Sequence, residues 1–195
     1  MIGFLSYLVF FTTIASILAI AALGLNLQWG NTGLFNGGVV AFFGAGAYGT
    51  LLLGGAPQSD HIGGFDLLYP IALLGGMIVA GLLAWIVGIL TIRLRHDYLA
   101  ISTFGVAVAF ENLMRNAQWL AGGAKGLRGF ERPLREFLGD GFLYNVSFLI
   151  IVLFILLIVY FFLELLVSSP FGRLLRAIRE DEYAARSLGK NPTNI

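Results

Sequence analysis

The fold is decided by Val146–Val167, VSFLIIVLFILLIVYFFLELLV, which is followed closely by Pro170–Gly189, PFGRLLRAIREDEYAARSLG. The first stretch carries a single charge, Glu164, and exceeds the roughly 20 apolar residues that a helix needs to cross a bilayer. The second stretch is rich in arginine and begins with proline, which is favoured in the first turn of a helix. A hydrocarbon-like segment that leads into a charged helix predicts an all-α membrane protein.

The composition supports this class of protein. The mean hydropathy is +0.86, with 58% hydrophobic and 12% charged residues, whereas soluble domains carry about 25% charged residues. The 26 glycines are about twice the usual share, as expected where membrane helices approach closely. A net charge of +1 gives no indication of nucleic-acid binding, and the sequence has no cysteine for a disulfide or a thiolate metal site.

Five segments are apolar and long enough to cross a bilayer as helices. They are residues 3–27, 36–54, 69–92, 98–120 and 143–167. No basic residue precedes the first, so we expect a retained membrane helix rather than a cleaved signal peptide. The second is rich in glycine and also compatible with a broken or re-entrant helix. We expect a polytopic membrane domain over 1–169 and a cytoplasmic part over 170–195.

The distribution of Lys and Arg predicts the orientation, since cytoplasmic loops are enriched in both. Basic residues gather in the 93–97 turn and in the tail after residue 170, whereas the 55–68 linker has none. With five crossings, the turn and the tail lie in the cytoplasm and the N-terminus lies outside. Residues 121–142 do not fit this scheme, because they carry four basic residues on the predicted external side.

The charged tail has the pattern of an amphipathic helix. Its apolar positions recur at spacings of three, four and seven, and they are Phe171, Leu174, Ile178, Ala185 and Leu188. Such a helix at a membrane surface fits docking into a groove of a partner protein. It fits binding to anionic lipid equally well.

Amides and glycines cluster between the first two apolar segments, at Gly24–Gly38. This composition is compatible with unwound backbone at membrane depth, which requires protein or a watery cavity around it. In that interpretation Asn26, Asn36, Gly37 and Gly38 line a polar path. The alternative is an interfacial turn whose glycines serve helix packing.

Glu111 and Arg115 are four residues apart in the fourth segment, the spacing of an intrahelical ion pair. Charges within a membrane segment usually face a cavity or the protein interior, so both are candidates for a path through the membrane. Alternatively, they lie near the outer end of the span and pair or snorkel there.

An enzymatic function has little support in the sequence. His96 stands beside Asp97, but the other histidine, His61, lies in a loop predicted on the opposite side. Gly122–Leu127, GGAKGL, lacks the spacing and the preceding strand of a nucleotide-binding loop. We expect no catalytic residue, metal or cofactor in this chain, and any ATP must be bound by another subunit.

Five motifs together resemble the permeases of ATP-binding cassette (ABC) importers for branched-chain amino acids, of the LivM type. In chain order they are GLNL-x-x-G-x-x-G-L from Gly24, FFGAGAY from Phe42, RLR-x-x-YLAI from Arg93, GG-x-x-GL from Gly122 and GRLLRAIREDE-x-AA-x-x-x-G from Gly172. The resemblance covers nearly the whole chain. Val39 departs from it where the family commonly has histidine, and Ala121 where threonine is usual. The family continues with further helices, so the end at Ile195 suggests a C-terminal truncation.

The last motif resembles the cytoplasmic coupling loop of these permeases. The resemblance implies that the loop docks on an ATPase through Glu182, Ala184, Ala185 and Gly189, and that three arginines lead into it, Arg173, Arg176 and Arg179. It therefore favours ATPase docking over lipid binding for the tail. It also places Asn26–Gly38 in the translocation region.

The resemblance implies a multi-pass permease subunit in a prokaryotic inner membrane. A second homologous permease would complete the path for leucine, isoleucine or valine. Two cytoplasmic ABC ATPases would bind ATP, and an extracytoplasmic amino-acid-binding protein would deliver the substrate. Alternatives are a permease for urea or short amides, a passive small-solute channel, and a membrane enzyme, against which the scarcity of histidine and the absence of cysteine argue.

Overall fold

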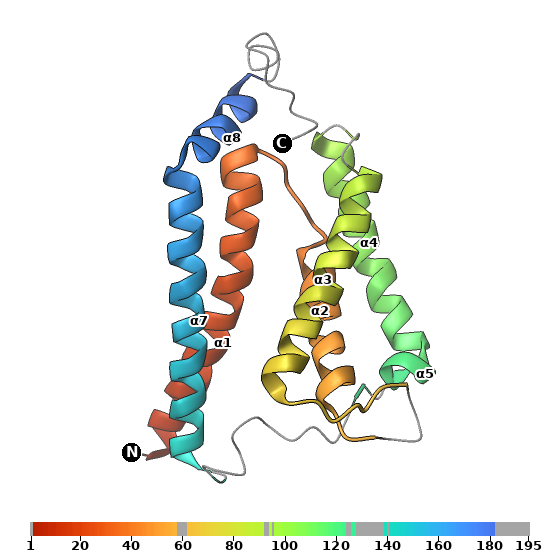
Figure 1. Cartoon of the computed structure of the whole chain (residues 1–195), viewed down its shortest axis with the longest axis vertical. Helices are drawn as coiled ribbons and strands as arrows, with labels where there is room; N and C mark the ends of the chain where they lie inside the picture. Colours follow the sequence, from red (N-terminus) through yellow and green to blue (C-terminus); the bar gives the residue numbers. More distant parts are fainter. Residues whose placement is uncertain are drawn as a thin grey trace. The chain divides into compact units, whose positions relative to one another are not determined.

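The computed structural model describes residues 2–57, 62–91, 94, 96–123, 126–127, 139 and 141–181, and every regular element in these ranges is helical. The elements are α1 (Ile2–Asn26), the π-helical turn η1 (Leu27–Thr32), α2 (Val39–Gly54), α3 (Tyr69–Thr91), α4 (His96–Asn116), α5 (Gln118–Ala121), α7 (Phe142–Ser168) and α8 (Pro170–Glu180) (Figure 1). The predicted all-α class is confirmed. The chain forms two compact units, Met1–Phe35 with Leu134–Ile195, and Asn36–Pro133.

Three described helices are long and apolar enough to cross a membrane, namely α1 with η1 (Gly3–Thr32), α3 and α7. They confirm a multi-pass membrane protein. At 16 residues, α2 spans about 24 Å, less than the hydrocarbon core of about 30 Å. Because α4 is less apolar and carries Asp97, Glu111 and Arg115, its crossing, like that of α2, stays a prediction.

The helix boundaries differ from the predicted ones in two informative places. α2 begins at Val39 rather than at residue 36, because the Asn36 side chain accepts a hydrogen bond from the Gly38 N–H at 2.8 Å. It continues unbroken to Gly54. The first helix continues beyond residue 27 as η1, which ends before Gly33 at a φ of 74°, a conformation that glycine adopts without strain.

In the first unit, α1 and α7 pack side by side and run in the same direction (Figure 1). The carboxyl ends of both helices therefore meet α8. If two membrane helices are parallel, the chain must cross the membrane an odd number of times between them. A single crossing by α3 meets this condition, and so do three crossings by α2, α3 and α4. The segment after α1 and the arginine-rich helix α8 thus lie on the same side of the membrane.

In the second unit, α2 and α3 form an antiparallel pair with small residues at the contact. A Cβ atom added to Gly49 would lie 3.1 Å from the Gly76 Cα, and one added to Gly54 would lie 2.9 Å from the Ala72 Cβ. Small residues allow such close approach of membrane helices. The high glycine content is therefore partly explained by this contact.

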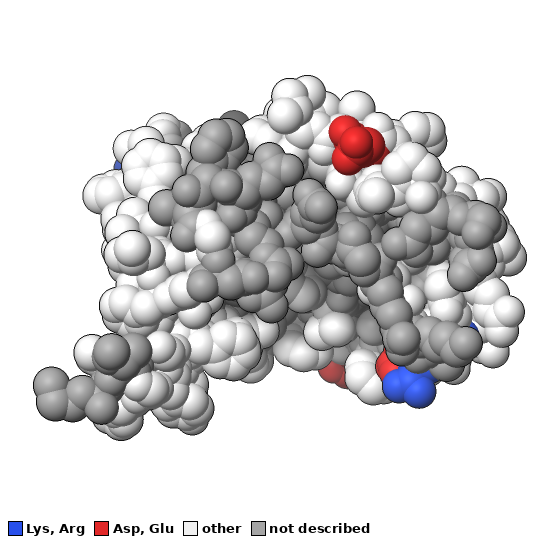
Figure 2. Space-filling model, turned by 90° about the horizontal axis from the view of Figure 1, so that it is seen from below, with Lys and Arg blue, Asp and Glu red and all other residues white. Residues whose placement is uncertain are grey.

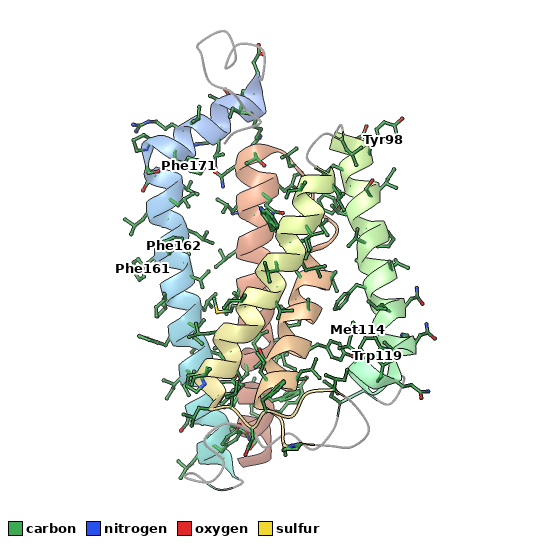
Figure 3. The ribbon with its side chains drawn as sticks, turned by 45° about the vertical axis from the view of Figure 1, so that its right-hand side comes forward. Tyr98, Met114, Trp119, Phe161, Phe162 and Phe171 are labelled. Carbon is green, nitrogen blue, oxygen red and sulfur yellow. The ribbon has the colours of Figure 1, made fainter. Side chains whose placement is uncertain are left out.

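The described surface is largely apolar. On the face that Figure 2 shows, the described charged side chains form a few isolated spots among described residues that are uncharged. Phe161 and Phe162, which are 62% and 65% exposed, project from α7 away from α1 (Figure 3). Large exposed apolar side chains on a membrane helix are suited to contact with lipid or with another subunit.

Candidate functional site

The corner between α7 and α8 is fixed by three neighbouring residues. The Ser169 side chain accepts a hydrogen bond from the Phe171 N–H at 3.2 Å and so caps α8, and Pro170 occupies its first turn. Gly172 is buried, and a Cβ atom there would overlap the carbonyl oxygen of Val167. Only glycine permits this approach, so the start of α8 is held tightly against the end of α7.

The three arginines of α8 have different environments. Arg179 donates a hydrogen bond from Nη1 to the carbonyl oxygen of Gly30 in η1. Arg176 donates from Nη2 to the carbonyl oxygen of Val167 in α7 at 3.3 Å. Arg173 is exposed, and its side chain makes no hydrogen bond or ion pair with any described residue. Two of the three arginines therefore join α8 to both long helices of its unit.

Four other predicted coupling residues lie outside the described part of the chain. They are Glu182, Ala184, Ala185 and Gly189. Their contact with an ATPase stays a prediction. The described part of the predicted coupling segment is α8, which ends just before them.

A pocket of about 240 Å³ lies between the carboxyl-terminal parts of α1 and α7. It is lined by Leu23, Asn26, Leu27, Gly30 and Asn31 from α1 and η1, and by Tyr160, Leu163, Glu164 and Val167 from α7. Each set recurs at spacings of three and four, so each occupies one face of its helix. The pocket therefore contains Asn26, which the sequence predicts for the polar path, together with the single charge of α7.

Four side chains with polar atoms line this pocket, those of Asn26, Asn31, Tyr160 and Glu164. None of them has a hydrogen bond or ion pair with another described residue. Gly30 leaves room for the first of these side chains, because a Cβ atom there would lie 2.5 Å from the Asn26 Oδ1. The π-helical turn that contributes Gly30 and Asn31 is of a kind frequent at functional sites. These polar groups are available to a ligand.

Asn36, Gly37 and Gly38 belong to the other unit, where they join the start of α2 to α4. The Gly37 N–H donates to the Thr103 Oγ1 at 3.0 Å. Thr103 is 1% exposed, and its hydroxyl donates to the carbonyl oxygen of Leu99 at 2.8 Å. These bonds satisfy backbone groups of a helix junction. A role for Asn36, Gly37 and Gly38 in translocation stays a prediction.

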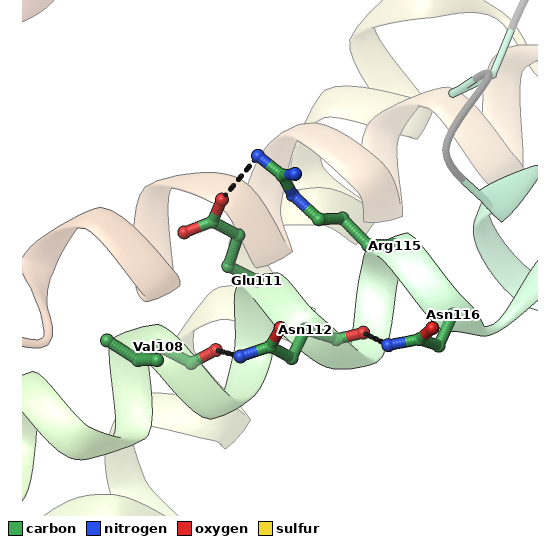
Figure 4. A network of polar contacts seen from close by, with 5 residues as sticks. All are labelled: Val108, Glu111, Asn112, Arg115 and Asn116. Carbon is green, nitrogen blue, oxygen red and sulfur yellow. Dashed lines mark hydrogen bonds and ion pairs between the residues drawn. The ribbon is translucent and has the colours of Figure 1, made fainter.

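The predicted ion pair on α4 is confirmed, with 2.8 Å between the Glu111 Oε1 and the Arg115 Nη2 (Figure 4). Both side chains are exposed, by 62% and 70% respectively. Asn112 and Asn116 lie beside them and donate to carbonyl oxygens one turn earlier, at 2.9 and 2.8 Å. These four residues form a polar stripe that requires water or protein next to it in a membrane. Whether the stripe borders the path stays a prediction.

Several residues of these sites could not be identified from the sequence. Glu164 stands out in the sequence as an isolated charge, and it is spaced from Tyr160 and Val167 so as to share one helix face with them. Nothing in the sequence, however, identifies α1 as the neighbour of α7. Thr103 carries no pattern that distinguishes it from other hydroxyls. Among the described residues, no group of three or more His, Asp or Glu side chains is placed to hold a metal ion.

Comparisons with known proteins identify sequence similarity to transport permeases. The profile of the family described as "Branched-chain amino acid transport system / permease component" matches residues 7–195. The chain is 34% identical to the "High-affinity branched-chain amino acid transport system permease protein LivM" of Escherichia coli (strain K12), over an alignment of 210 positions that covers 94% of the chain and 46% of the relative. The protein of the same name from Salmonella typhimurium is 33% identical over 209 residues, with the same coverage of 94% and 46%.

An archaeal protein is also similar. The "Probable branched-chain amino acid transport permease protein LivM" of Methanocaldococcus jannaschii is 29% identical over an alignment of 199 positions, which covers 88% of the chain and 56% of the relative. The chain spans about half the length of these curated relatives. No solved structure matches it significantly.

Proposed function

The chain belongs to the family of branched-chain amino acid transport permease components, and from this membership we propose that it is a permease subunit of an ABC importer. It forms part of the translocation path for leucine, isoleucine and valine, and a second homologous permease completes the path. Two cytoplasmic ATPases bind and hydrolyse ATP. An extracytoplasmic binding protein delivers the amino acid, and this chain performs no covalent chemistry.

The observation that carries the proposal is the attachment of α8 to both long helices of its unit. Gly172 packs against the end of α7, and Arg179 holds the carbonyl group of Gly30 in η1. Gly30 also lines the pocket. A displacement of α8 by an ATPase would therefore be transmitted to the backbone of the pocket. This attachment supports a coupling role for α8 over a role in lipid binding alone.

ATP-coupled leucine uptake tests this role in cells that produce the chain with the other subunits of its transport system. We expect Glu182→Arg and Gly189→Trp to abolish uptake, because they place opposite charge or bulk at the predicted ATPase contact, while the chain still inserts into the membrane. Asp60→Arg is the matched control, since it makes the same charge reversal in a linker predicted on the external side. Unchanged uptake in Glu182→Arg and Gly189→Trp would contradict the proposal.

Competition for uptake identifies the cargo. An excess of unlabelled isoleucine or valine should suppress uptake of labelled leucine, and the same excess of urea or acetamide should not. The opposite result would identify a permease for urea or short amides. Leucine uptake that persists after ATP depletion would indicate a passive channel instead.

A further inference from the structure

The pocket between α1 and α7 combines one unpaired carboxylate with two unpaired amides, and apart from the hydroxyl group of Tyr160 the other side chains that line it are apolar. We propose that it binds a primary ammonium group attached to a short apolar chain. This inference rests on the proposed function for one of its two candidate ligands, a free amino acid such as leucine.

The polar groups of the pocket match an ammonium ion. A primary ammonium has three N–H donors and no acceptor, whereas a carboxylate and two amide oxygens are acceptors. Glu164, Asn26 and Asn31 supply these three groups. Glu164 is exposed on α7, and an ionised carboxylate on an apolar membrane helix is costly unless water or a cation compensates it. None of the described residues provides that cation for Glu164, and a bound ammonium would provide it.

The remaining lining matches an aliphatic chain. Four aliphatic side chains face the pocket, those of Leu23, Leu27, Leu163 and Val167. The volume of about 240 Å³ lies somewhat below the roughly 300 Å³ at which most ligand pockets begin. The part of the ligand inside the pocket therefore has few non-hydrogen atoms.

Two kinds of ligand can bring a primary ammonium group to the carboxyl end of a membrane helix. One is a free aliphatic amino acid, and the other is the ethanolamine headgroup of a membrane lipid. Both carry a primary ammonium, whereas the trimethylated choline headgroup has no N–H donor. The two sources can therefore be separated by the lipid in which the protein is studied.

The test uses the full chain in nanodiscs of phosphatidylglycerol, with binding of radiolabelled leucine as the readout. We expect 3-methylbutylamine, which keeps the ammonium, to compete with leucine, and 4-methylpentanoate, which lacks it, not to compete. Glu164→Gln keeps the size of the side chain and removes its charge, and it should weaken binding about tenfold or more, as expected for a lost charge-assisted hydrogen bond. Glu180→Gln, on the exposed face of α8, is the matched control and should leave binding unchanged.

A second arm tests the lipid. Native mass spectrometry should show phosphatidylethanolamine retained by the unmodified chain and lost from Glu164→Gln, with phosphatidylcholine retained by neither. Glu164-dependent binding of leucine identifies the free amino acid, and Glu164-dependent retention of phosphatidylethanolamine without leucine binding identifies the lipid. If Glu164→Gln changes neither, the ammonium site is wrong. The proposed function would still stand if Glu182→Arg abolished uptake, so the two failures are distinguishable.

Discussion

Arg179 on α8 donates a hydrogen bond to the backbone carbonyl oxygen of Gly30 in η1, although the two residues are 149 positions apart in the sequence. A Cβ atom on Gly33, the residue that ends η1, would lie 3.1 Å from the Cγ of the same arginine. The glycine-and-amide segment after α1 and the arginine-rich helix after α7 therefore form one connected structure. In the proposed importer, this connection links the ATPases to the membrane helices.

Removing the Arg179 side chain should weaken that link. We expect Arg179→Ala to lower the rate of ATP-coupled leucine uptake several-fold without reducing the amount of protein in the membrane, because α8 keeps its attachment to α7 but loses the one to η1. Arg173→Ala removes the same charge from an arginine without a described side-chain partner and should have a smaller effect. Equal uptake by the two variants would show that the contact with Gly30 is not used.

A side chain at position 172, where α7 turns into α8, should destabilise the protein. In Gly172→Ala the new methyl group overlaps the carbonyl oxygen of Val167, and we expect a loss of stability of about 1–3 kcal/mol, as for other overpacked sites. Thermal unfolding of the detergent-solubilised protein measures this loss. Gly24→Ala, at a position with no atom within 4 Å of the added Cβ, is the control. A midpoint for Gly172→Ala as high as that of the control would rule out the tight corner.

A similar effect of added side-chain volume is expected where α2 and α3 are in contact in the second unit. A Cβ atom on Gly76 would overlap the Thr50 hydroxyl, whereas one on Gly81 in the same helix meets no atom within 4 Å. Gly76→Ala should therefore lower the thermal midpoint, with a cost of about 1–3 kcal/mol. Gly81→Ala should not lower it. A reversed order of the two midpoints would mean that α2 and α3 do not pack through this face.

The buried hydroxyl of Thr103 supports the start of α2. Thr103→Val preserves the shape of the side chain but removes the acceptor of the Gly37 N–H, and an unsatisfied buried donor costs about 1–3 kcal/mol. We expect a lower thermal midpoint and faster amide hydrogen exchange at Gly37. Ser102→Ala, at the adjacent position without a described side-chain partner, should change neither. Unaltered exchange at Gly37 would refute this hydrogen bond.

Several elements could be predicted from local sequence because their signals are local. Ser169 followed by Pro170 marks the start of a helix, and α8 begins there. The apolar segments predicted α1, α3 and α7 to within a few residues at most boundaries. The start of α2 was three residues too early, because the prediction did not include the side-chain hydrogen bond between Asn36 and Gly38. The spacing of Glu111 and Arg115 was sufficient to predict their ion pair.

The pairing of helices could not be predicted in the same way. α1 and α7 are apolar on all sides, so no stripe of side chains shows which face meets a neighbour. The pocket depends on that pairing, and its α7 residues were missed for this reason. Helix-end propensities also did not predict that the first helix continues as the π-helical turn η1, because the hydrogen bonds of η1 depend on the surrounding structure.

The most direct test of the proposed coupling role of α8 is cross-linking from this helix in the assembled transporter. The chain contains no cysteine, so Ala177→Cys, on an exposed position of α8, gives a single reactive site. We expect this cysteine to cross-link to the ATPase subunit in a yield that changes with ATP, and we expect a membrane-impermeant reagent not to label it from outside. Labelling from the external face, or cross-links to lipid alone, would contradict the coupling role.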